Sequence, residues 1–397
     1  MRVLAAMSGG VDSAVAAALA VEAGHDVVGV HLALAAGTGP GGCCTTEDAL
    51  DAQRAADVLG IGCHVWDLSA QFAEIVVADF LDGYAAGRTP NPCVRCNDHV
   101  KFGLLLDRAR EQGFDAVCTG HYARVDVGEG LGEEVVLRRA TYGPKDQSYV
   151  LAVAGPDRLA RTMFPLGEMA SKDQVRALAA ARGLPMATKG DSLDLCFVPD
   201  GDLRGFLRRR LGSASGEIVE TDGTVVGHHD GTYGYTIGQR RGLALGRPAP
   251  DGKPRFVLEV CPKENEVIVG SRELLAVDEI RGIRATWAGV PVDQAARFLQ
   301  EPEQSGARSE EFEVTAQVRA HADPVRAKAY LTWAPDPEAE EENALRLETV
   351  VRLLDPLSGV APGQTMVLYQ GTRVLGQSTI ARAYSLNRED IQEALGA

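Results

Sequence analysis

The sequence has no long hydrophobic run, although 45% of its 397 residues are hydrophobic. A helix that crosses a membrane needs about 20 apolar residues in succession, and the apolar runs here are far shorter. Residues 1–7 also lack the charged region, apolar segment and cleavage site of a signal peptide. Charged residues make up 24%, as in a soluble globular protein, so we expect a cytoplasmic location without membrane contact.

Basic residues are outnumbered by acidic ones: 40 Lys and Arg stand against 55 Asp and Glu, which gives a formal net charge of −15. Taken alone, this balance argues against nucleic-acid binding, because contacts to phosphates need Lys and Arg. The charge is uneven, however. Acidic residues gather in 301–313 and 336–342, whereas basic residues gather at Arg204, 208–210 and 240–241. A local basic face on an acidic protein is therefore compatible with the sequence.

A Gly-rich motif near the N-terminus lacks the Lys that completes a Walker-type phosphate loop. It reads Met7-Ser8-Gly9-Gly10-Val11-Asp12-Ser13, between an apolar run and an Ala-rich segment that is predicted to be helical. A strand, a Gly-Gly turn and a helix start form a site for an anion, because glycines permit close approach and the free N–H groups and helix dipole face the ligand. The hydroxyls of Ser8 and Ser13 add donors. The alternative is a turn that only joins a strand to a helix.

Strand-like and helix-like segments alternate through the first part of the chain. Strands are predicted at 3–7, 27–34, 64–68 and 116–119, and helices at 12–23, 46–59, 70–84 and 99–112. This alternation predicts an α/β fold with a doubly wound parallel sheet. Ligands of such sheets lie beyond the carboxyl ends of the strands, where Ser8, 32–34 and 119–121 are expected.

After about residue 200, short alternating segments separated by Gly, Asp and Pro replace the helices. This pattern is typical of small β-barrels. A chain of 397 residues is also too long for one ordinary core. We therefore expect a nucleotide-binding and catalytic domain at 1–202, a central β-domain at 203–276 and a C-terminal β-barrel domain at 277–397.

The eight cysteines do not indicate a disulfide framework in a cytoplasmic protein of this size. Cys63 and Cys118 lie in predicted strands, where cysteine acts as a small buried hydrophobe. The segment 89–97 is predicted to be a loop because it holds two prolines, and it contains the pair Cys93-x-x-Cys96. Such a pair serves as a redox couple, as half of a metal site or as one reactive thiol with a bystander, and each use needs a thiolate.

Three further polar segments interrupt the predicted elements. Asp191–Val198 contains Cys196 and by itself is typical of a strand with one buried cysteine. Gly120–Arg124 places His121 after a strand at the predicted ligand edge, although a lone His there is more often structural. Lys145–Tyr149 offers a cation, polar groups and a phenol in a row, and Tyr235–Leu243 is basic and punctuated by glycine.

In their order and spacing, six segments resemble the motifs of the tRNA-specific 2-thiouridylases. They are SGGVDS, RTPNPCVRCN, TGHYAR, KDQSYVL, DSLDLCFV and YTIGQRRGL, and the resemblance spans roughly residues 1–382. The first motif alone resembles only the wider superfamily of PP-loop ATP pyrophosphatases. The combination is specific, so the sequence is identified as a member of the narrower family.

The resemblance implies ATP-dependent transfer of sulfur to C2 of the wobble uridine in the anticodon arm of tRNA, giving 2-thiouridine. The C2 carbonyl is a weak electrophile, and transfer of AMP to its oxygen makes a good leaving group. A persulfide then supplies the sulfur, and a second thiol attacks its S–S bond, so that the two cysteines end as a disulfide. Mg²⁺ is expected with ATP. The sulfur donor is expected to be a cysteine desulfurase or a relay protein.

The resemblance also implies roles for individual residues. Cys196 matches the persulfide carrier and Cys96 the nucleophile, whereas the family does not require a cysteine at position 93. Residues that match the family's ATP contacts are Ala6, Met7, Ser8, Gly9, Gly10, Val11, Asp12, Ser13, Leu32 and Gly120. Residues that match its tRNA contacts are Asn91, Pro92, Cys93, His121, Lys145, Asp146, Gln147, Arg319, Ala320 and Gln364.

Three other functions use parts of the same pattern. Cys93, Cys96 and Cys196 could ligate an iron–sulfur cluster that leaves one iron open to carry sulfur. A PP-loop enzyme that forms an amide or another C–N bond would need neither Cys96 nor Cys196. A nucleotide-binding redox sensor would switch partners through a Cys96–Cys196 disulfide and release no pyrophosphate with tRNA.

Overall fold

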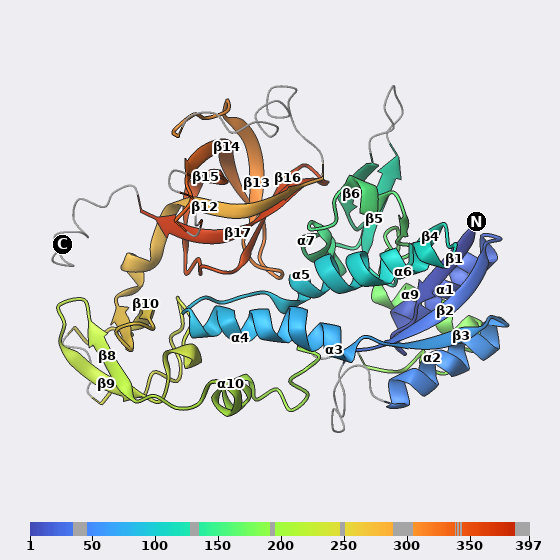
Figure 1. The fold of residues 1–397 in the computed structure, drawn as a ribbon, viewed down its shortest axis with the longest axis horizontal. Helices are drawn as coiled ribbons and strands as arrows, with labels where there is room; N and C mark the ends of the chain where they lie inside the picture. The colour runs from blue at the N-terminus through green and yellow to red at the C-terminus, as the bar shows by residue number, and fades with distance from the viewer. Residues whose placement is uncertain are drawn as a thin grey trace.

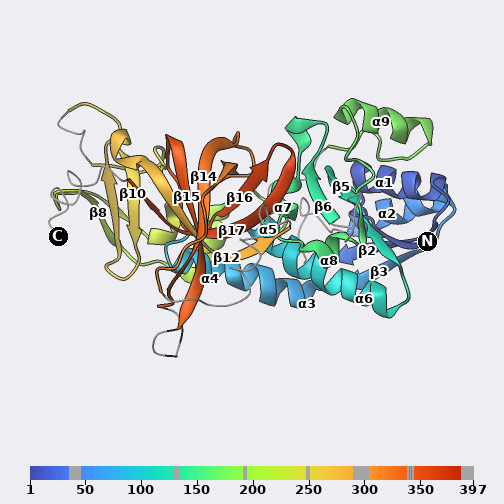
Figure 2. The same ribbon diagram turned by 90° about the horizontal axis from the view of Figure 1, so that it is seen from above.

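The computed structural model describes residues 1–34, 46–127, 135–190, 195–246, 251–288, 305–337, 339, 341 and 344–385. The molecule is elongated, with a parallel sheet and its helices at one end and two β-rich units toward the other (Figures 1 and 2). Within those ranges, no helix is long and apolar enough to cross a bilayer.

The parallel sheet has five strands in the order β3-β2-β1-β4-β7. All its neighbouring strands pair in parallel. The strands are β1 (Arg2–Ala6), β2 (Asp26–Ala33), β3 (Cys63–Asp67), β4 (Ala116–Cys118) and β7 (Thr162–Met163). The chain builds outward from β1 to β3 and then returns to place β4 on the other side of β1. A crevice for a ligand is expected at that reversal, outside the carboxyl ends of β1 and β4.

Helices cover both faces of this sheet, which explains why β1 is apolar at every internal position. Side chains of α1 (Val11–Glu22), α2 (Thr46–Leu59) and α9 (Lys172–Ala181) share one buried cluster with Val3 and Ala5 of β1. Leu4 points to the opposite face and packs with a different set of helical segments. These segments are α3 (Ser69–Phe72), the π-helical turns Ala73–Val77 and Asn97–Leu104, and α6 (Leu105–Glu111).

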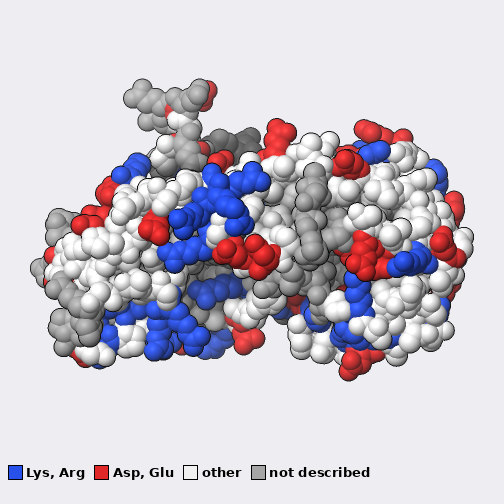
Figure 3. Space-filling model, turned by 90° about the horizontal axis from the view of Figure 1, so that it is seen from below, with Lys and Arg blue, Asp and Glu red and all other residues white. Residues whose placement is uncertain are grey.

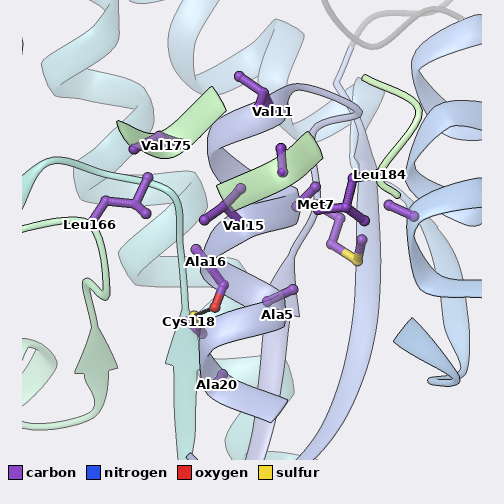
Figure 4. Packing of buried hydrophobic residues seen from close by; sticks show 14 of the residues in the cluster. Ala5, Met7, Val11, Val15, Ala16, Ala20, Cys118, Leu166, Val175 and Leu184 are labelled. Carbon is purple, nitrogen blue, oxygen red and sulfur yellow. Dashed lines mark hydrogen bonds between the residues drawn. The ribbon is translucent and has the colours of Figure 1, made fainter. Parts of the chain in front are cut away.

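The Ala-rich sequence of α1 lets this helix lie close to the sheet and to α9, as the packing in Figure 4 shows. Cys118 of β4 donates from its sulfur to the carbonyl of Ala16 at 3.6 Å. Burial raises the pKa of the Cys118 thiol to about 12, so this cysteine is unreactive, as predicted. Cys63 is only half-buried, so the prediction of a fully buried position was wrong there.

The second half of the chain forms two β-units. One is a four-stranded sheet in the order β10-β11-β8-β9. The other is a barrel in which β12-β15-β14-β13-β16-β17 run in sequence and β12 pairs with β17 to close the circle. The strands are β8 (Gly216–Glu220), β9 (Val225–His229), β10 (Phe256–Cys261), β11 (Glu266–Gly270), β12 (Ala276–Trp287), β13 (Phe312–Gln317), β14 (Val325–Pro335), β15 (Leu345–Ser358), β16 (Thr365–Gln370) and β17 (Arg373–Tyr384).

The barrel is packed onto the first unit through a shared core. The hairpin β5 (Ala123–Val127) and β6 (Val135–Arg139) belongs to the first half of the chain, yet β6 pairs with β17 of the barrel. Leu137, Tyr149 and Tyr369 belong to the same buried cluster. The Tyr149 hydroxyl donates to the Thr365 carbonyl at 2.6 Å. The short helices α7 (Ser148–Leu151) and α8 (Pro156–Leu159) also belong to this cluster.

The predicted doubly wound parallel sheet followed by β-barrel domains is confirmed, and the described residues of the central domain form the four-stranded sheet β10-β11-β8-β9. Three local differences remain. Pro92–Cys96 forms helix α5 rather than part of a loop, because proline suits the first helical turn. Of the segment 191–198, residues 191–194 lie outside the described residues, and 195–198 form a turn at 196–197 rather than a strand. The basic segment after residue 202 forms helix α10 (Leu203–Leu211), which Asp202 caps by accepting from the Gly205 N–H.

Candidate active site

A cavity of about 370 Å³ lies at the predicted edge of the sheet, beyond the ends of β1 and β4. Its wall includes Ser8, Asp12 and Gly120 from the predicted nucleotide site. It also includes all three cysteines of interest: Cys93, Cys96, Cys196. Apolar side chains of β2 and of the segment after it, at 30, 32 and 34, complete one side. The structure therefore brings segments that are far apart in the sequence to one cavity.

The loop after β1 has the geometry expected of an anion site. The Ser8 N–H donates to the Ser13 hydroxyl at 3.0 Å, and that hydroxyl donates to the Gly10 carbonyl at 3.0 Å. These bonds fold the loop back on the first turn of α1. The buried imidazole of His31 on β2 hydrogen-bonds the Met7 carbonyl at 2.9 Å. Gly10 caps the helix with an extended backbone and no side-chain bond, so the N–H groups of the first turn face the loop.

Two glycines are required here by space rather than by flexibility alone. Gly9 has φ +77, and a Cβ at this position would collide with the backbone of Asp48 on α2. A Cβ on Gly120 would lie 2.6 Å from the Ser13 nitrogen. Gly120 thus lets the chain after β4 lie against the start of α1, which keeps the cavity wall continuous.

Asp12 is held by two residues that sequence reasoning did not select. Lys172 donates to both carboxylate oxygens, at 2.8 and 2.7 Å, and the Tyr122 hydroxyl donates to one of them at 2.7 Å. Lys172 is the first residue of α9, directly after the cap Ser171. A cation at a helix N-terminus is unfavourable because it opposes the helix dipole. This unfavourable placement is the sequence feature that could have identified Lys172 as a residue of the site.

Lys189 is a second cation beside the loop that sequence reasoning missed. Its ammonium donates to the Gly9 carbonyl at 3.2 Å and to Asp48 and Asp51 of α2 at 2.8 and 2.7 Å. Hydrogen bonds to these two carboxylates raise the pKa of Lys189 despite the opposing effect of partial burial. Lys189 therefore joins α2 to the phosphate loop and stays charged.

The pair of cysteines at 93 and 96 lies on the first turn of a helix that points at the cavity. The side chain of Asn91 caps α5 by accepting from the backbone N–H groups of Cys93 and Val94, at 3.1 and 3.2 Å. Cys93 is exposed, whereas Cys96 is buried, with 8% of its surface accessible. The Asn91 side chain thus fixes the start of α5, and both thiols line the cavity.

Cys196 is fixed by its neighbour in the sequence. The ring of Phe197 packs against Phe72 of α3, Phe80 of α4 (Ala78–Ala85) and Phe206 of α10, with centroid distances of 6.0, 5.2 and 5.5 Å. This aromatic anchor holds residues 195–197 on the cavity wall. Cys196 packs on the same buried cluster that contains Cys96. The two thiols, one hundred positions apart, therefore converge on one side of the cavity.

His121 lies on the cavity wall but is almost fully buried. Its Nδ1 is 2.7 Å from the Thr119 hydroxyl and its Nε2 is 3.5 Å from the Lys101 ammonium. Burial, followed by the nearby charge of Lys101, holds the pKa of His121 well below its usual value. The imidazole is therefore neutral at physiological pH.

This neutral, buried histidine predicts a pH dependence of stability. On unfolding, His121 recovers a pKa near 6.5, so the unfolded chain binds an extra proton below that pH. Its contribution is complete above about pH 6.5 and falls by up to about 1.4 kcal/mol per unit as the pH drops toward the folded-state pKa. We expect the difference in unfolding free energy between the wild type and His121→Gln to shrink from pH 7.5 to 5.5 in urea titrations. A difference that stays constant over this range would contradict the buried neutral state.

The remaining residues predicted to contact tRNA fall into two groups. Gln147 lines the cavity, and its side chain accepts from the Tyr122 N–H at 2.9 Å. Lys145 is half-exposed beside it, whereas the Asp146 carboxylate accepts internally from Ala140, Ser148 and Arg139. The second group lies on barrel loops: Arg319 is exposed, Ala320 is half-buried, and Gln364 donates to the Thr89 carbonyl at 2.7 Å. The Gln364 bond joins the barrel to the segment that leads into α5.

Within the described ranges of the chain, no group of three or more His, Cys, Asp and Glu is placed to hold a metal ion. Cys93, Cys96 and Cys196 lie within these ranges, so the arrangement does not favour the iron–sulfur alternative. Asp12 supplies the carboxylate among the described residues of the cavity wall.

Three family models match the chain in succession. They describe a tRNA methyl transferase HUP domain at 1–200, a tRNA methyl transferase PRC-barrel domain at 204–271 and an aminomethyltransferase beta-barrel domain at 292–380. A tRNA-specific 2-thiouridylase MnmA from Paenarthrobacter aurescens is 58% identical over 98% of this chain and 100% of its own length. The chain belongs to the tRNA-specific 2-thiouridylase family. A family member from Kocuria rhizophila is also 58% identical, over 97% of this chain and 98% of its own.

Distant likenesses are also found among solved structures. The U34-tRNA thiolase NcsA from Methanococcus maripaludis, solved with its [4Fe-4S] cluster, aligns with 53% of this chain and 67% of that chain. The sequence identity is 17% and the TM-score 0.33, so the likeness carries no argument about the cysteines here.

Proposed function

We propose that the protein is a tRNA-uridine 2-sulfurtransferase that uses ATP to place sulfur on C2 of the wobble uridine. One observation supports this function above the others: the phosphate loop, Cys96 and Cys196 line a single cavity. A PP-loop enzyme that forms a C–N bond has no use for the thiols. A redox sensor has no use for a base-sized cavity between its thiols and its nucleotide site.

In the first step, the loop after β1 binds the phosphates of ATP through backbone N–H groups and the Ser8 hydroxyl. The Ser13 hydroxyl holds the loop in shape through its bonds to the Ser8 N–H and the Gly10 carbonyl. Apolar side chains at 30, 32 and 34 form the cavity wall beside this loop. The uridine C2 oxygen attacks the α-phosphate, pyrophosphate leaves and AMP stays on the oxygen. Lys172 and Tyr122 fix the orientation of Asp12 during this step.

The site fits Mg²⁺ that binds together with the nucleotide rather than Mg²⁺ held by protein ligands alone. Mg²⁺ is usually bound by one or two carboxylates together with phosphates and waters, and Asp12 is the carboxylate at hand. When bound, Mg²⁺ neutralises charge on the phosphates as pyrophosphate leaves.

In the second step, the terminal sulfur of a Cys196 persulfide attacks C2, and AMP leaves with the oxygen. The Cys96 thiolate attacks the sulfur that remains bound to Cys196, which frees the thiocarbonyl and joins the two cysteines in a disulfide. Cys96 is buried on the cavity wall, where it can face a base that enters the cavity. The target base must leave the anticodon stack to enter, which costs a few kcal/mol and less in a loop than in a duplex.

The two β-units and α10 are proposed to bind the anticodon arm, with domain limits at 1–202, 203–276 and 277–397. Figure 3 shows Lys and Arg gathered on the half of the lower face where these units lie, despite the net charge of −15. Arg204 and 208–210 are exposed on α10. The sulfur donor is proposed to be a cysteine desulfurase or a relay protein that loads Cys196.

Reversing the charge of α10 tests this binding surface. We expect the triple variant Arg208→Glu, Arg209→Glu, Arg210→Glu to weaken tRNA binding at least tenfold and to flatten the dependence of log K on log salt. Each lost phosphate contact removes about 0.7–0.9 from that slope. Filter binding at several salt concentrations measures both quantities. Arg54→Glu, an exposed change on α2, serves as the control, and an unchanged slope in the triple variant would refute the surface.

A further inference from the structure

The proposed reaction leaves the protein with a problem of access. It ends with Cys96 joined to Cys196, and one of these sulfurs lies on a residue with only 8% of its surface accessible. Cys196 is half-buried and can be reached by the sulfur donor, but in the disulfide it is joined to the buried Cys96. A dithiol on a protein reductant has to bring its own sulfur into line with a disulfide, so a buried bond is reduced slowly. The next cycle needs both thiols free.

Cys93 is the one thiol of the three on the cavity wall that is exposed. It precedes Cys96 by three positions on α5, and residues at this spacing lie on one face of a helix with Cβ atoms about 5–6 Å apart. The Asn91 cap, which binds the Cys93 and Val94 N–H groups, fixes this first turn. A small adjustment of the turn brings the two sulfurs within the range of a disulfide, whose Cβ atoms are about 3.5–4.5 Å apart.

We propose that Cys93 resolves the disulfide formed in each cycle and carries the oxidation to the surface, an inference that rests on the proposed function. The Cys93 thiolate attacks the Cys96 sulfur, so a Cys93–Cys96 bond forms and the Cys96–Cys196 bond breaks. Cys196 leaves as a thiolate that can be loaded again. A dithiol reductant then attacks the exposed Cys93 sulfur, releases Cys96 and Cys93 as thiols, and is itself oxidised to a disulfide.

This assignment explains why the chain carries a cysteine that sulfur transfer itself does not need. It also separates two roles on one turn: Cys96 faces the reacting base, and Cys93 faces solvent. The thiol–disulfide exchange between the cysteines needs no oxidant. The dithiol reductant supplies the two electrons that reduce the final disulfide.

Mapping the disulfides after one turnover tests the proposal. Persulfide-loaded enzyme receives tRNA and ATP without reductant, is trapped with an alkylating agent and is digested for mass spectrometry. We expect wild type to yield the Cys93–Cys96 disulfide with Cys196 alkylated, and Cys93→Ser to yield Cys96–Cys196. A wild-type map with Cys93 alkylated and Cys96 joined to Cys196, or with Cys93 joined to Cys196, would overturn the proposal.

A kinetic measurement gives a second readout. It corrects for any effect of the substitution on tRNA binding or sulfur transfer, because each variant is compared with itself. For each variant, the multiple-turnover rate with a protein dithiol reductant is divided by its own single-turnover rate. We expect this ratio to fall at least tenfold in Cys93→Ser and to recover with a small phosphine reductant that can enter the cavity. Cys261→Ser, a half-buried thiol on β10, is the matched control and should keep the wild-type ratio. An unchanged ratio in Cys93→Ser would overturn the proposal.

The outcome is separable from the proposed function itself. If Cys196→Ser still forms 2-thiouridine in a single turnover, the sulfur-transfer route is wrong whatever Cys93 does. If Cys196→Ser is inactive and the wild type accumulates Cys96–Cys196, the transfer route stands and the role of Cys93 fails.

Discussion

Replacement of either Cys96 or Cys196 by serine is expected to abolish the gain of sulfur by tRNA while leaving adenylation intact. The two variants should differ in what they accumulate. Cys196→Ser cannot carry a persulfide, so the adenylated base is the last species formed. Cys96→Ser still loads sulfur on Cys196 but has no thiol to cut the S–S bond. Pyrophosphate release and nucleoside mass spectrometry measure the two halves of the reaction separately.

Adenylation and sulfur transfer can be separated in this way because the cysteines and the phosphate loop occupy different parts of one cavity wall. Ser8, Ser13 and Gly120 make their contacts without involving either sulfur. Cys118→Ser is a poor control because its side chain is buried against α1, whereas Cys261→Ser changes a half-buried thiol remote from the cavity. Full thiolation by Cys196→Ser would refute the persulfide role.

The second large effect is expected at Lys172, which no motif singled out. Lys172→Met removes the cation that binds both oxygens of Asp12, and the lysine side chain is only 13% exposed. Charge-assisted bonds of this kind are about twice as strong as neutral ones. The Asp12 carboxylate, left with the neutral Tyr122 hydroxyl as its partner, would then repel the phosphates of ATP. We expect the rate of tRNA-dependent pyrophosphate release to fall at least 100-fold, which corresponds to about 2.7 kcal/mol of transition-state stabilisation.

The chain offers a matched control for Lys172 at the other end of the same helix pair. Arg182, which follows α9, bonds Glu22 of α1 at 2.6 and 2.7 Å. Arg182→Met therefore removes another ion pair between α9 and α1, but one that is absent from the cavity wall. It should leave pyrophosphate release within about twofold of wild type, because this partly exposed pair involves no residue of the cavity wall. Equal losses in both variants would mean that Lys172 acts only by holding α9 in place.

The parallel sheet could be predicted from the sequence because its signals are local. Apolar runs followed by glycine-capped helices set the alternation, and β1 to β4 lie within one residue of the predicted ranges, whereas the two-residue edge strand β7 was not predicted. The Gly-Gly loop was recognisable for the same reason. The helix at Pro92–Cys96 was missed because two prolines were taken as a loop, although Asn91 before Pro92 is a strong helix start.

The contacts that complete the site could not be predicted, because they join segments far apart in the chain. Lys172 and Asp12 are separated by 160 positions, and Lys189 and Asp48 by 141. The aromatic anchor around Phe197 draws on α3, α4 and α10, and nothing in the local sequence pairs these rings. The hairpin β5–β6 joins the barrel sheet, although more than half of the sequence separates β6 from its partner strand β17.

The central claim is that sulfur held by Cys196 reaches a base activated in the same cavity. Its most direct test is a single turnover with enzyme whose persulfide carries ³⁵S, freed of excess donor before tRNA and ATP are added. The account predicts that the label leaves Cys196 and appears in 2-thiouridine in equal amount to the AMP released. Label that stays on the protein while thiolated tRNA forms would contradict it.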